Sequence, residues 1–181
     1  MIHLVLDVES TGLYGDGFAC GWVVVDDQTG RTLAEGRLVA PSSQAHAHSA
    51  EDRKWVARNV PQMEWTSPTL VQLRTDFWVI WETWRERGAL MWADCGFPVE
   101  AAFLFTAVDN FPDKRARSAP QPLHEIATLR LAVGLDPIAT EERLPDEYPR
   151  HDPLADARQS ARLLLEALAL NREMLAHAVA H

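Results

Sequence analysis

Cysteine and long apolar runs are scarce in this chain. Its 181 residues include two cysteines, Cys20 and Cys95, whose separation does not fit a metal-binding pair, and we expect both to be structural free thiols. No stretch of about 20 apolar residues is available to span a bilayer. Asp7 and Glu9 interrupt the one early apolar run, so no secretory signal is predicted. We therefore expect a soluble, cytoplasmic protein with no membrane partner.

Positive charge is also in short supply. Lysine and arginine together number 17 against 26 aspartates and glutamates, which gives a formal net charge of −9. Proteins that bind long nucleic-acid duplexes present a basic surface, so this composition argues against a long duplex as the substrate. The length and the 47% hydrophobic content are sufficient to fill one core, and we predict a single domain over residues 1–181.

The first apolar run ends in two acids separated by one residue. In a strand over residues 2–8, side chains alternate, so Asp7 and Glu9 point to one side of the sheet and Val8 to the other. Two neighbouring carboxylates disfavour joint ionisation unless a cation lies between them, and oxygen ligands suit Mg²⁺ or Mn²⁺. The pattern therefore predicts a metal site, with a merely polar strand end as the alternative.

The start of the last predicted helix carries a second group of ionisable residues. Asp152 suits an N-cap and Pro153 suits the first helical position, which predicts a helix to about residue 175. Asp156 then lies one turn inside the helix, and His151 lies just outside it. A histidine in that place can bind metal or exchange a proton near neutral pH. The alternative is an exposed histidine and an acid that complements the helix dipole.

These two segments together resemble the DEDDh family of 3′-5′ exonucleases, which includes oligoribonuclease, ribonuclease T and the proofreading subunits of DNA polymerases. Residues 7–12, with the sequence DVESTG, match the first family motif. His151, followed after four residues by Asp156, matches the last one. A sister group carries a tyrosine four residues before the final acid, where this chain has Asp152, so the sequence favours the histidine branch.

The resemblance implies a metal-dependent enzyme that hydrolyses the terminal phosphodiester bond at the 3′ end of single-stranded RNA or DNA and releases nucleoside 5′-monophosphates. It implies two divalent ions, Mg or Mn, about 4 Å apart. Asp7, Glu9 and Asp156 would be metal ligands, and His151 would be the general base. The residues expected to hold the terminal nucleotide are Ser10, Thr11, Gly12 and Leu13. Homodimerisation is an expectation by analogy alone.

The second family motif is where this chain departs from the pattern, because two acids compete for one role. Glu100 has the expected context, since Pro98 can start a helix and apolar Phe103 and Leu104 follow it. Asp94 has the usual residue type and ends a predicted strand. Either side chain can bind metal. We favour Glu100 as the second-motif carboxylate and interpret Asp94 as a residue close to the metal.

The sequence is also compatible with two other functions. The divergent second motif would suit a nucleic-acid-binding module that has lost catalysis, and the site would also suit hydrolysis of small nucleotides. The one dense basic cluster, residues 113–117, lies in a predicted loop and is interpreted either as a contact for the substrate backbone or as a solvated turn.

The predicted fold is a ribonuclease H-like α/β fold. It comprises a five-stranded mixed sheet with helices on both faces, the first strand central and the hairpin pair 18–26 and 31–39 antiparallel to the rest. Residues 50–59 and 68–87 are predicted helices, and the apolar residues of the second recur at helical spacing, which indicates a core-facing stripe. Further helices are expected over 98–110 and 125–133, the fifth strand over 121–124, and an irregular loop over 135–150.

Overall fold

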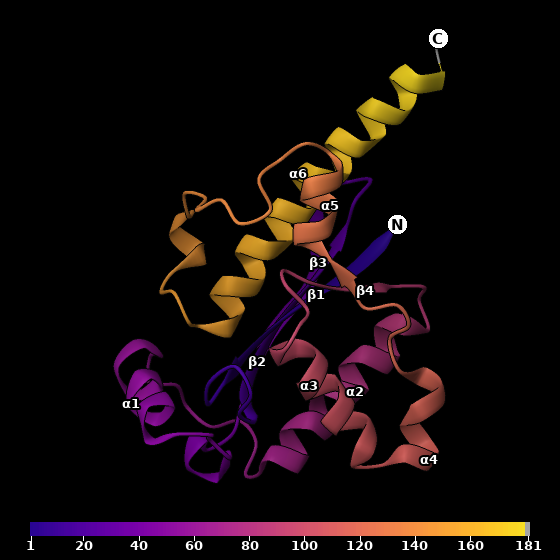
Figure 1. Cartoon of the computed structure of the whole chain (residues 1–181). Helices are drawn as coiled ribbons and strands as arrows, with labels where there is room; N and C mark the ends of the chain where they lie inside the picture. Colours follow the sequence, from indigo (N-terminus) through magenta and orange to yellow (C-terminus); the bar gives the residue numbers. More distant parts are fainter. Residues whose placement is uncertain (180–181) are drawn as a thin grey trace.

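The computed structural model describes residues 1–179, which form a five-stranded sheet with helices on both of its faces (Figure 1). The strands are β1 Ile2–Ser10, β2 Gly17–Asp26, β3 Arg31–Val39, β4 Leu90–Ala93 and β5 His124–Glu125. The α-helices are α1 Ala50–Asn59, α2 Leu70–Arg85, α3 Val99–Asp109, α4 Pro112–Arg115, α5 Ile126–Ala132 and α6 Pro153–Val179. Among these helices, none combines the length and the apolar character needed to cross a bilayer.

The sheet has the strand order β3-β2-β1-β4-β5, which places β1 in the centre as predicted. β2 is antiparallel to both of its neighbours, whereas β4 and β5 run parallel to β1. The prediction that both hairpin strands oppose the rest is therefore wrong for β3, which runs in the direction of β1. A strand joined to β2 by a tight turn must reverse the direction of β2, and β2 is itself antiparallel to β1.

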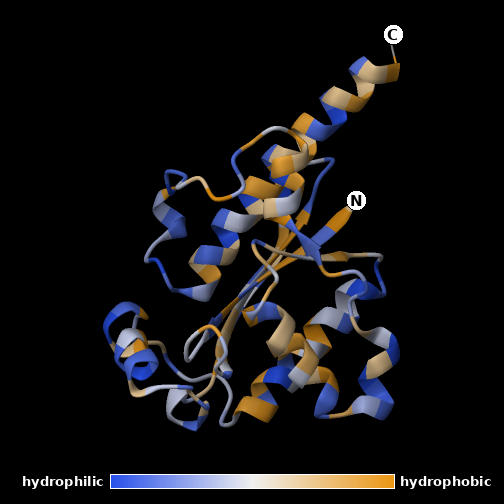
Figure 2. Ribbon diagram, in the orientation of Figure 1, coloured by the Kyte–Doolittle hydropathy of each residue, from blue (hydrophilic) through white to orange (hydrophobic). Residues whose placement is uncertain are grey.

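Two apolar layers hold the helices on the sheet. Leu4, Leu6 and Val8 of β1 belong to a buried cluster with residues of α2 and α3, while Val5 belongs to a second cluster with residues of α5 and α6. The predicted apolar stripe of α2 is confirmed, since Leu73, Phe77, Trp78 and Trp81 are all buried. Figure 2 shows this apolar character concentrated along the strands between the two helical layers. Burial of such side chains is the main stabilising contribution to the fold.

The basic cluster at residues 113–117 is not the loop that the sequence predicted. Its first half forms α4, and Arg115 is buried. The Arg115 guanidinium lies over the rings of Trp78 and Phe111 and donates to the carbonyl of Ala107 at 2.7 Å. Arg115 thus packs within the protein, because cation–π contacts and a carbonyl bond compensate for its loss of water.

Other predicted elements are confirmed within a few residues. The helix predicted over 50–59 coincides with α1, and Gly134, with a φ of 81°, follows the end of α5 as a left-handed residue. Residues 135–150 are irregular except for a single turn of 3-10 helix at Pro145–Glu147. Both cysteines are free, Cys20 buried and Cys95 exposed.

Candidate active site

The carboxyl end of β1 presents two acids on the sheet face that α6 covers. Val8 lies in the cluster under α2 and α3, and Val5 lies in the cluster under α5 and α6. Because side chains alternate along a strand, Asp7 and Glu9 continue the face of Val5. The predicted separation of these two acids from Val8 is thus confirmed, and the apolar face of β1 becomes acidic as the strand approaches its end.

The beginning of α6 is capped as the sequence predicted. Asp152 Oδ1 accepts hydrogen bonds from the backbone nitrogens of Leu154 at 3.0 Å and Ala155 at 3.3 Å. These are amides that lack a partner inside the helix. The Asp152 carboxylate is also ion-paired with Arg37 of β3. The N-cap therefore both starts α6 and attaches it to the sheet.

A glycine lets the first turn of α6 lie directly on the sheet. Gly21 of β2 is the strand partner of Asp7, and a Cβ atom built at Gly21 would lie 2.0 Å from the carbonyl oxygen of Pro153. Any side chain at Gly21 would force the helix away from the strand. Gly21 therefore controls how closely the residues at the start of α6 approach the acids of β1.

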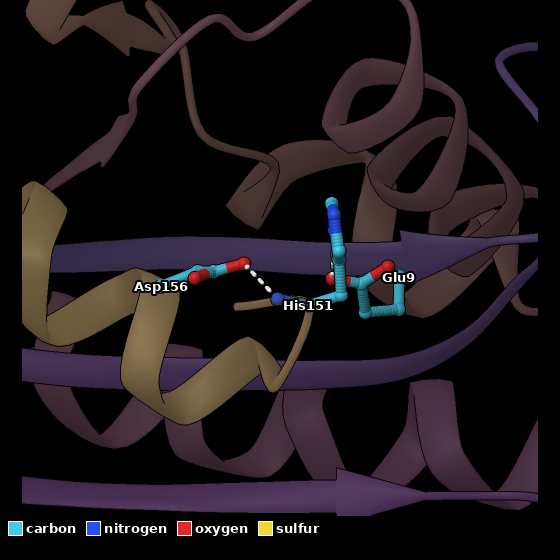
Figure 3. A group of neighbouring side chains, drawn as sticks. All are labelled: Glu9, His151 and Asp156. Atoms are coloured by element: carbon cyan, nitrogen blue, oxygen red, sulfur yellow. Dashed lines mark hydrogen bonds and ion pairs between the residues drawn. The ribbon is translucent and has the colours of Figure 1, made fainter. Parts of the chain in front are cut away.

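His151 lies between the carboxylates of Glu9 and Asp156 (Figure 3). Its backbone nitrogen donates to Asp156 Oδ2 at 3.0 Å, and its Nδ1 atom lies 3.7 Å from Glu9 Oε1. One ligand atom from each of the three residues lies within 4.8 Å of the others. His151 adopts a φ of 62°, a left-handed conformation that is uncommon for residues other than glycine and that occurs at functional sites.

Trp55 is a neighbour of this site that sequence reasoning missed. Its ring meets the His151 ring edge to face, with the centroids 4.9 Å apart, and the residue is 47% exposed. The signal in the sequence was a tryptophan on the otherwise polar helix α1, where no apolar stripe accounts for it. Trp55 restricts the positions open to the His151 ring and presents an aromatic surface beside it.

Glu100 enters the site from α3 and binds the backbone of β1. The ladder between β1 and β4 ends at the pair Leu6 and Ala93, and the amide of Val8 beyond it donates to Glu100 Oε1 at 3.2 Å. Glu100 is buried, with 8% of its surface exposed. As expected from the helix pattern, Phe103 and Leu104 pack in the core.

Asp94 occupies a different position from Glu100. It follows the end of β4, is exposed, and lines a cavity of about 240 Å³ together with His151, Arg143, Arg150 and others. The structure thus places Glu100 in the interior against β1 and Asp94 at the rim of the site.

The electrostatics of the cluster disfavour its full ionisation. Removal of water raises the pKa of Asp7 well above its ordinary value, and Asp156, Glu100 and Glu9 raise it further. Burial, followed by Asp156, raises the pKa of Glu9 to about 8. Burial also raises the pKa of Glu100 to about 7, against the effect of its hydrogen bond from Val8. Bound divalent cations would relieve this repulsion, and a donor set of carboxylate oxygens suits Mg²⁺ or Mn²⁺.

The turn after β1 has most of its polar groups occupied internally. The Ser10 hydroxyl donates to the carbonyl of Gly12 at 2.8 Å, and Thr11 is buried, its hydroxyl donating to the carbonyl of His46. Gly12 has a φ of 92°, and a Cβ atom there would lie 2.6 Å from Asp52 Cγ. Leu13, in contrast, is 63% exposed. The turn offers a ligand an apolar side chain and a rigid backbone.

Comparison with known proteins bears on the fold. No family model matches the chain, and no curated protein matches it in sequence. The crystal structure of the nuclease domain of 3′hExo, described as a DEDDh family member bound to rAMP, superposes with a TM-score of 0.53 at 12% identity, covering 93% of this chain and 92% of that one. The chain has the fold of a DEDDh nuclease domain.

A full-length 3′-exonuclease structure aligns with a TM-score of 0.47 at 11% identity, over 93% of this chain and 81% of the other. The predicted ribonuclease H-like architecture is confirmed by the 3′hExo nuclease domain and by the strand order of the sheet. The acids at the end of β1 and the start of α6 stand at the carboxyl edge of the central strand of this fold.

Proposed function

We propose that the chain is a metal-dependent 3′-5′ exonuclease of the DEDDh type, which hydrolyses the terminal phosphodiester bond of single-stranded RNA or DNA and releases nucleoside 5′-monophosphates. The observation that carries the proposal is the meeting of Glu9, His151 and Asp156, with ligand atoms within 4.8 Å of one another, beside the acids Asp7 and Glu100. The shared fold with a nuclease domain that binds rAMP supports a nucleotide ligand.

The carboxylates are the groups that would hold the metal ions. Asp7, Glu9, Glu100 and Asp156 would bind two divalent ions, Mg²⁺ or Mn²⁺, with Asp94 near them at the rim. When bound, such ions neutralise carboxylate charge, polarise the phosphate and activate water for attack. The hydrogen bonds that Glu100 accepts from Val8 and that Asp156 accepts from His151 keep both acids in place for this role.

His151 is the proposed general base. Its Nδ1 atom faces Glu9, which leaves Nε2 to take the proton from the attacking water. The side chain is 38% exposed, so the proton can pass on to solvent. The edge contact with Trp55 and the backbone bond to Asp156 restrict the ring to the region above the carboxylates.

The substrate proposed for this site is a short single-stranded 3′ end. Leu13, in the turn after β1, and Trp55, beside His151, are both exposed and offer apolar surface for stacking with bases, which does not require a basic groove. The net charge of −9 is compatible with a strand whose last phosphate is held through metal ions. Residues 1–181 would act as one exonuclease domain.

An oligonucleotide assay tests the proposal. RNA and DNA oligomers with a 5′ label are incubated with Mn²⁺ or with chelator, and the products are resolved by length. We expect metal-dependent shortening from the 3′ end and release of mononucleotides. Binding of the oligomer without shortening would favour the inactive module, and hydrolysis confined to free nucleotides would favour the small-nucleotide enzyme.

A further inference from the structure

The loop before His151 is fixed to its surroundings by arginines on α5 and α6. Arg162 of α6 donates to the two carboxylate oxygens of the buried Glu147 at 2.7 and 3.0 Å. Arg130 of α5 is ion-paired with Glu141, and Arg158 of α6 donates to the carbonyl of Asp146 at 3.1 Å. Because the loop is held at several points, a side chain that it carries has a defined position.

That side chain is Arg143, whose guanidinium reaches the proposed metal ligands. Arg143 Nη1 lies 2.5 Å from Asp156 Oδ1 and donates to the carbonyl of Glu147 at 2.7 Å. The Arg143 side chain is only 10% exposed. Among the lysines and arginines in residues 1–179, only Arg143 is ion-paired with a carboxylate of the site. The loop thus places a largely buried positive charge where a divalent ion is proposed to bind.

The contact with Asp156 satisfies charge but not hydrogen bonding. Asp156 Oδ1 is buried and accepts no hydrogen bond of normal geometry from the described residues, so its ion pair with Arg143 is not accompanied by a hydrogen bond. A buried carboxylate oxygen left in this state is costly. Asp156 Oδ1 is therefore suited to exchange the Arg143 guanidinium for a divalent ion, which can bind the oxygen with better geometry.

A route for the displaced guanidinium is present. Arg143 lines the cavity of about 240 Å³ that also borders His151 and Asp94. A guanidinium that leaves Asp156 can remain on the wall of this cavity, held by the carbonyl of Glu147. Guanidinium groups bind phosphate oxygens in pairs, and this chain has few other positive charges near the site.

We propose that Arg143 is the resident counter-cation of the carboxylate cluster: a divalent ion replaces it at Asp156, and the freed guanidinium then binds a phosphate of the nucleotide. The inference rests on the proposed function, because it assigns the phosphate contact of that same site. It accounts for phosphate recognition by an acidic protein through one largely buried arginine in place of a basic surface.

The test measures binding without turnover. Mn²⁺ affinity of the free protein and AMP affinity of the Mn²⁺-loaded protein are determined by calorimetry for wild type, Arg143→Gln and Arg150→Gln. Arg150 lines the same cavity but makes no ion pair with Asp156, so Arg150→Gln removes the same charge without the contact. We expect Arg143→Gln to bind Mn²⁺ roughly tenfold more tightly and AMP roughly tenfold more weakly, since repulsion of the ion and attraction of the phosphate are both lost.

The charge-conserving variant separates charge from folding. Arg143→Lys should bring the Mn²⁺ affinity back toward the wild-type value, whereas damage to the loop would leave it as altered as in Arg143→Gln. Equal Mn²⁺ and AMP affinities for Arg143→Gln and Arg150→Gln would overturn the role of Arg143 while leaving the exonuclease proposal intact. Failure of the wild type to bind Mn²⁺ at all would overturn both.

Discussion

Two buried glutamates in this molecule have opposite electrostatics. Glu147, in the loop before α6, is 2% exposed. Burial by itself would raise the pKa of Glu147, but the hydrogen bonds from Arg162 act against burial, and the pKa is lowered. Glu9, at the end of β1, is 7% exposed, and burial together with Asp156 raises its pKa to about 8. The difference lies in the partner, because Glu147 has a well-aligned arginine and Glu9 is surrounded by further acids.

Glu147 is a structural carboxylate, whereas Glu9 is a carboxylate whose surroundings favour binding of a cation. A buried acid with an arginine partner needs no bound cation to offset its charge, and that charge contributes to stability. A group of buried and partly buried acids that includes Asp7, Glu9 and Glu100 raises the free energy of the folded protein near neutral pH unless a cation joins it. Perturbed carboxylates gathered at one edge of a sheet are characteristic of functional sites.

The largest expected effect comes from removing one acid of the cluster. Asp7→Asn should abolish divalent-metal binding and lower nuclease activity by roughly 10³-fold or more, because the charge stabilisation that metal ions supply amounts to several kcal/mol. Calorimetry with Mn²⁺ and the oligonucleotide assay measure both effects. The matched control is Glu147→Gln, which removes a buried acid of the other kind. Because Glu147 helps to fix the loop that carries Arg143, this variant should change metal affinity by no more than the roughly tenfold expected for Arg143→Gln. Normal metal-dependent turnover in Asp7→Asn would contradict the assignment.

A smaller effect is expected from the histidine. His151→Ala should lower turnover by roughly 10²- to 10⁴-fold, the usual contribution of a general base, while Mn²⁺ still binds. Asp156→Ala should impair both turnover and Mn²⁺ binding, since its carboxylate is a proposed ligand. Turnover and calorimetry on the two variants test the division of roles. Loss of metal in His151→Ala together with its retention in Asp156→Ala would show that the roles are reversed.

Substitutions of Glu100 and Asp94, the two acids of the second motif, should impair metal binding to different extents. Glu100→Gln should behave like Asp7→Asn, because Glu100 is buried against β1 and its pKa is raised by burial and, to a smaller extent, by Asp94. Asp94→Asn should weaken metal affinity by about 10- to 100-fold, as changes near a metal site do. Activity titrations with Mn²⁺ compare them. An inactive Asp94→Asn beside a nearly normal Glu100→Gln would identify the strand-end acid as the ligand.

The smallest effect is on stability and depends on pH. A carboxylate whose pKa is raised on folding contributes stability at low pH, and this contribution is lost as the pH rises. Because of Glu9, the stability of the metal-free protein should therefore fall as the pH rises from 4.5 to about 8. Glu147, with a lowered pKa, contributes stability above its ordinary pKa and loses it on acidification. Metal-free Glu9→Gln should therefore gain on the order of 1 to 3 kcal/mol at pH 8. Glu147→Gln should lose stability at the same pH.

Thermal melts between pH 4 and 9, with and without Mn²⁺, measure these changes. Saturating Mn²⁺ should remove the loss of wild-type stability at high pH, because ions that bind only the folded state stabilise it. Metal-free wild type whose stability does not fall from pH 5 to pH 8 would contradict the difference between Glu9 and Glu147.

Local signals in the sequence were sufficient for much of this site. Alternation along β1 placed Asp7 and Glu9 on one face, and the Asp152 cap fixed the start of α6 at the predicted residue. The pattern around Pro98 predicted the helix that carries Glu100, with Phe103 and Leu104 in the core. Each of these features is set by neighbours within a few residues, so a sequence pattern can carry it.

Contacts between distant segments were not predictable in the same way. The roles of Gly21, Trp55 and Arg143 depend on residues 13 to 132 positions away, with which they share no local pattern. The direction of β3 and the burial of Arg115 also follow from packing partners elsewhere in the chain. Such features were missed because turn chemistry and periodicity report only the local environment.

Anomalous X-ray scattering from crystals grown with Mn²⁺ tests the central claim most directly, because it locates the ions without reference to activity. We expect Mn²⁺ peaks within coordination distance of Asp7, Glu9 and Asp156, with the Arg143 guanidinium no longer at Asp156 Oδ1. Absence of any Mn²⁺ peak at these carboxylates, with the contact between Arg143 and Asp156 unchanged at saturating Mn²⁺, would contradict this expectation.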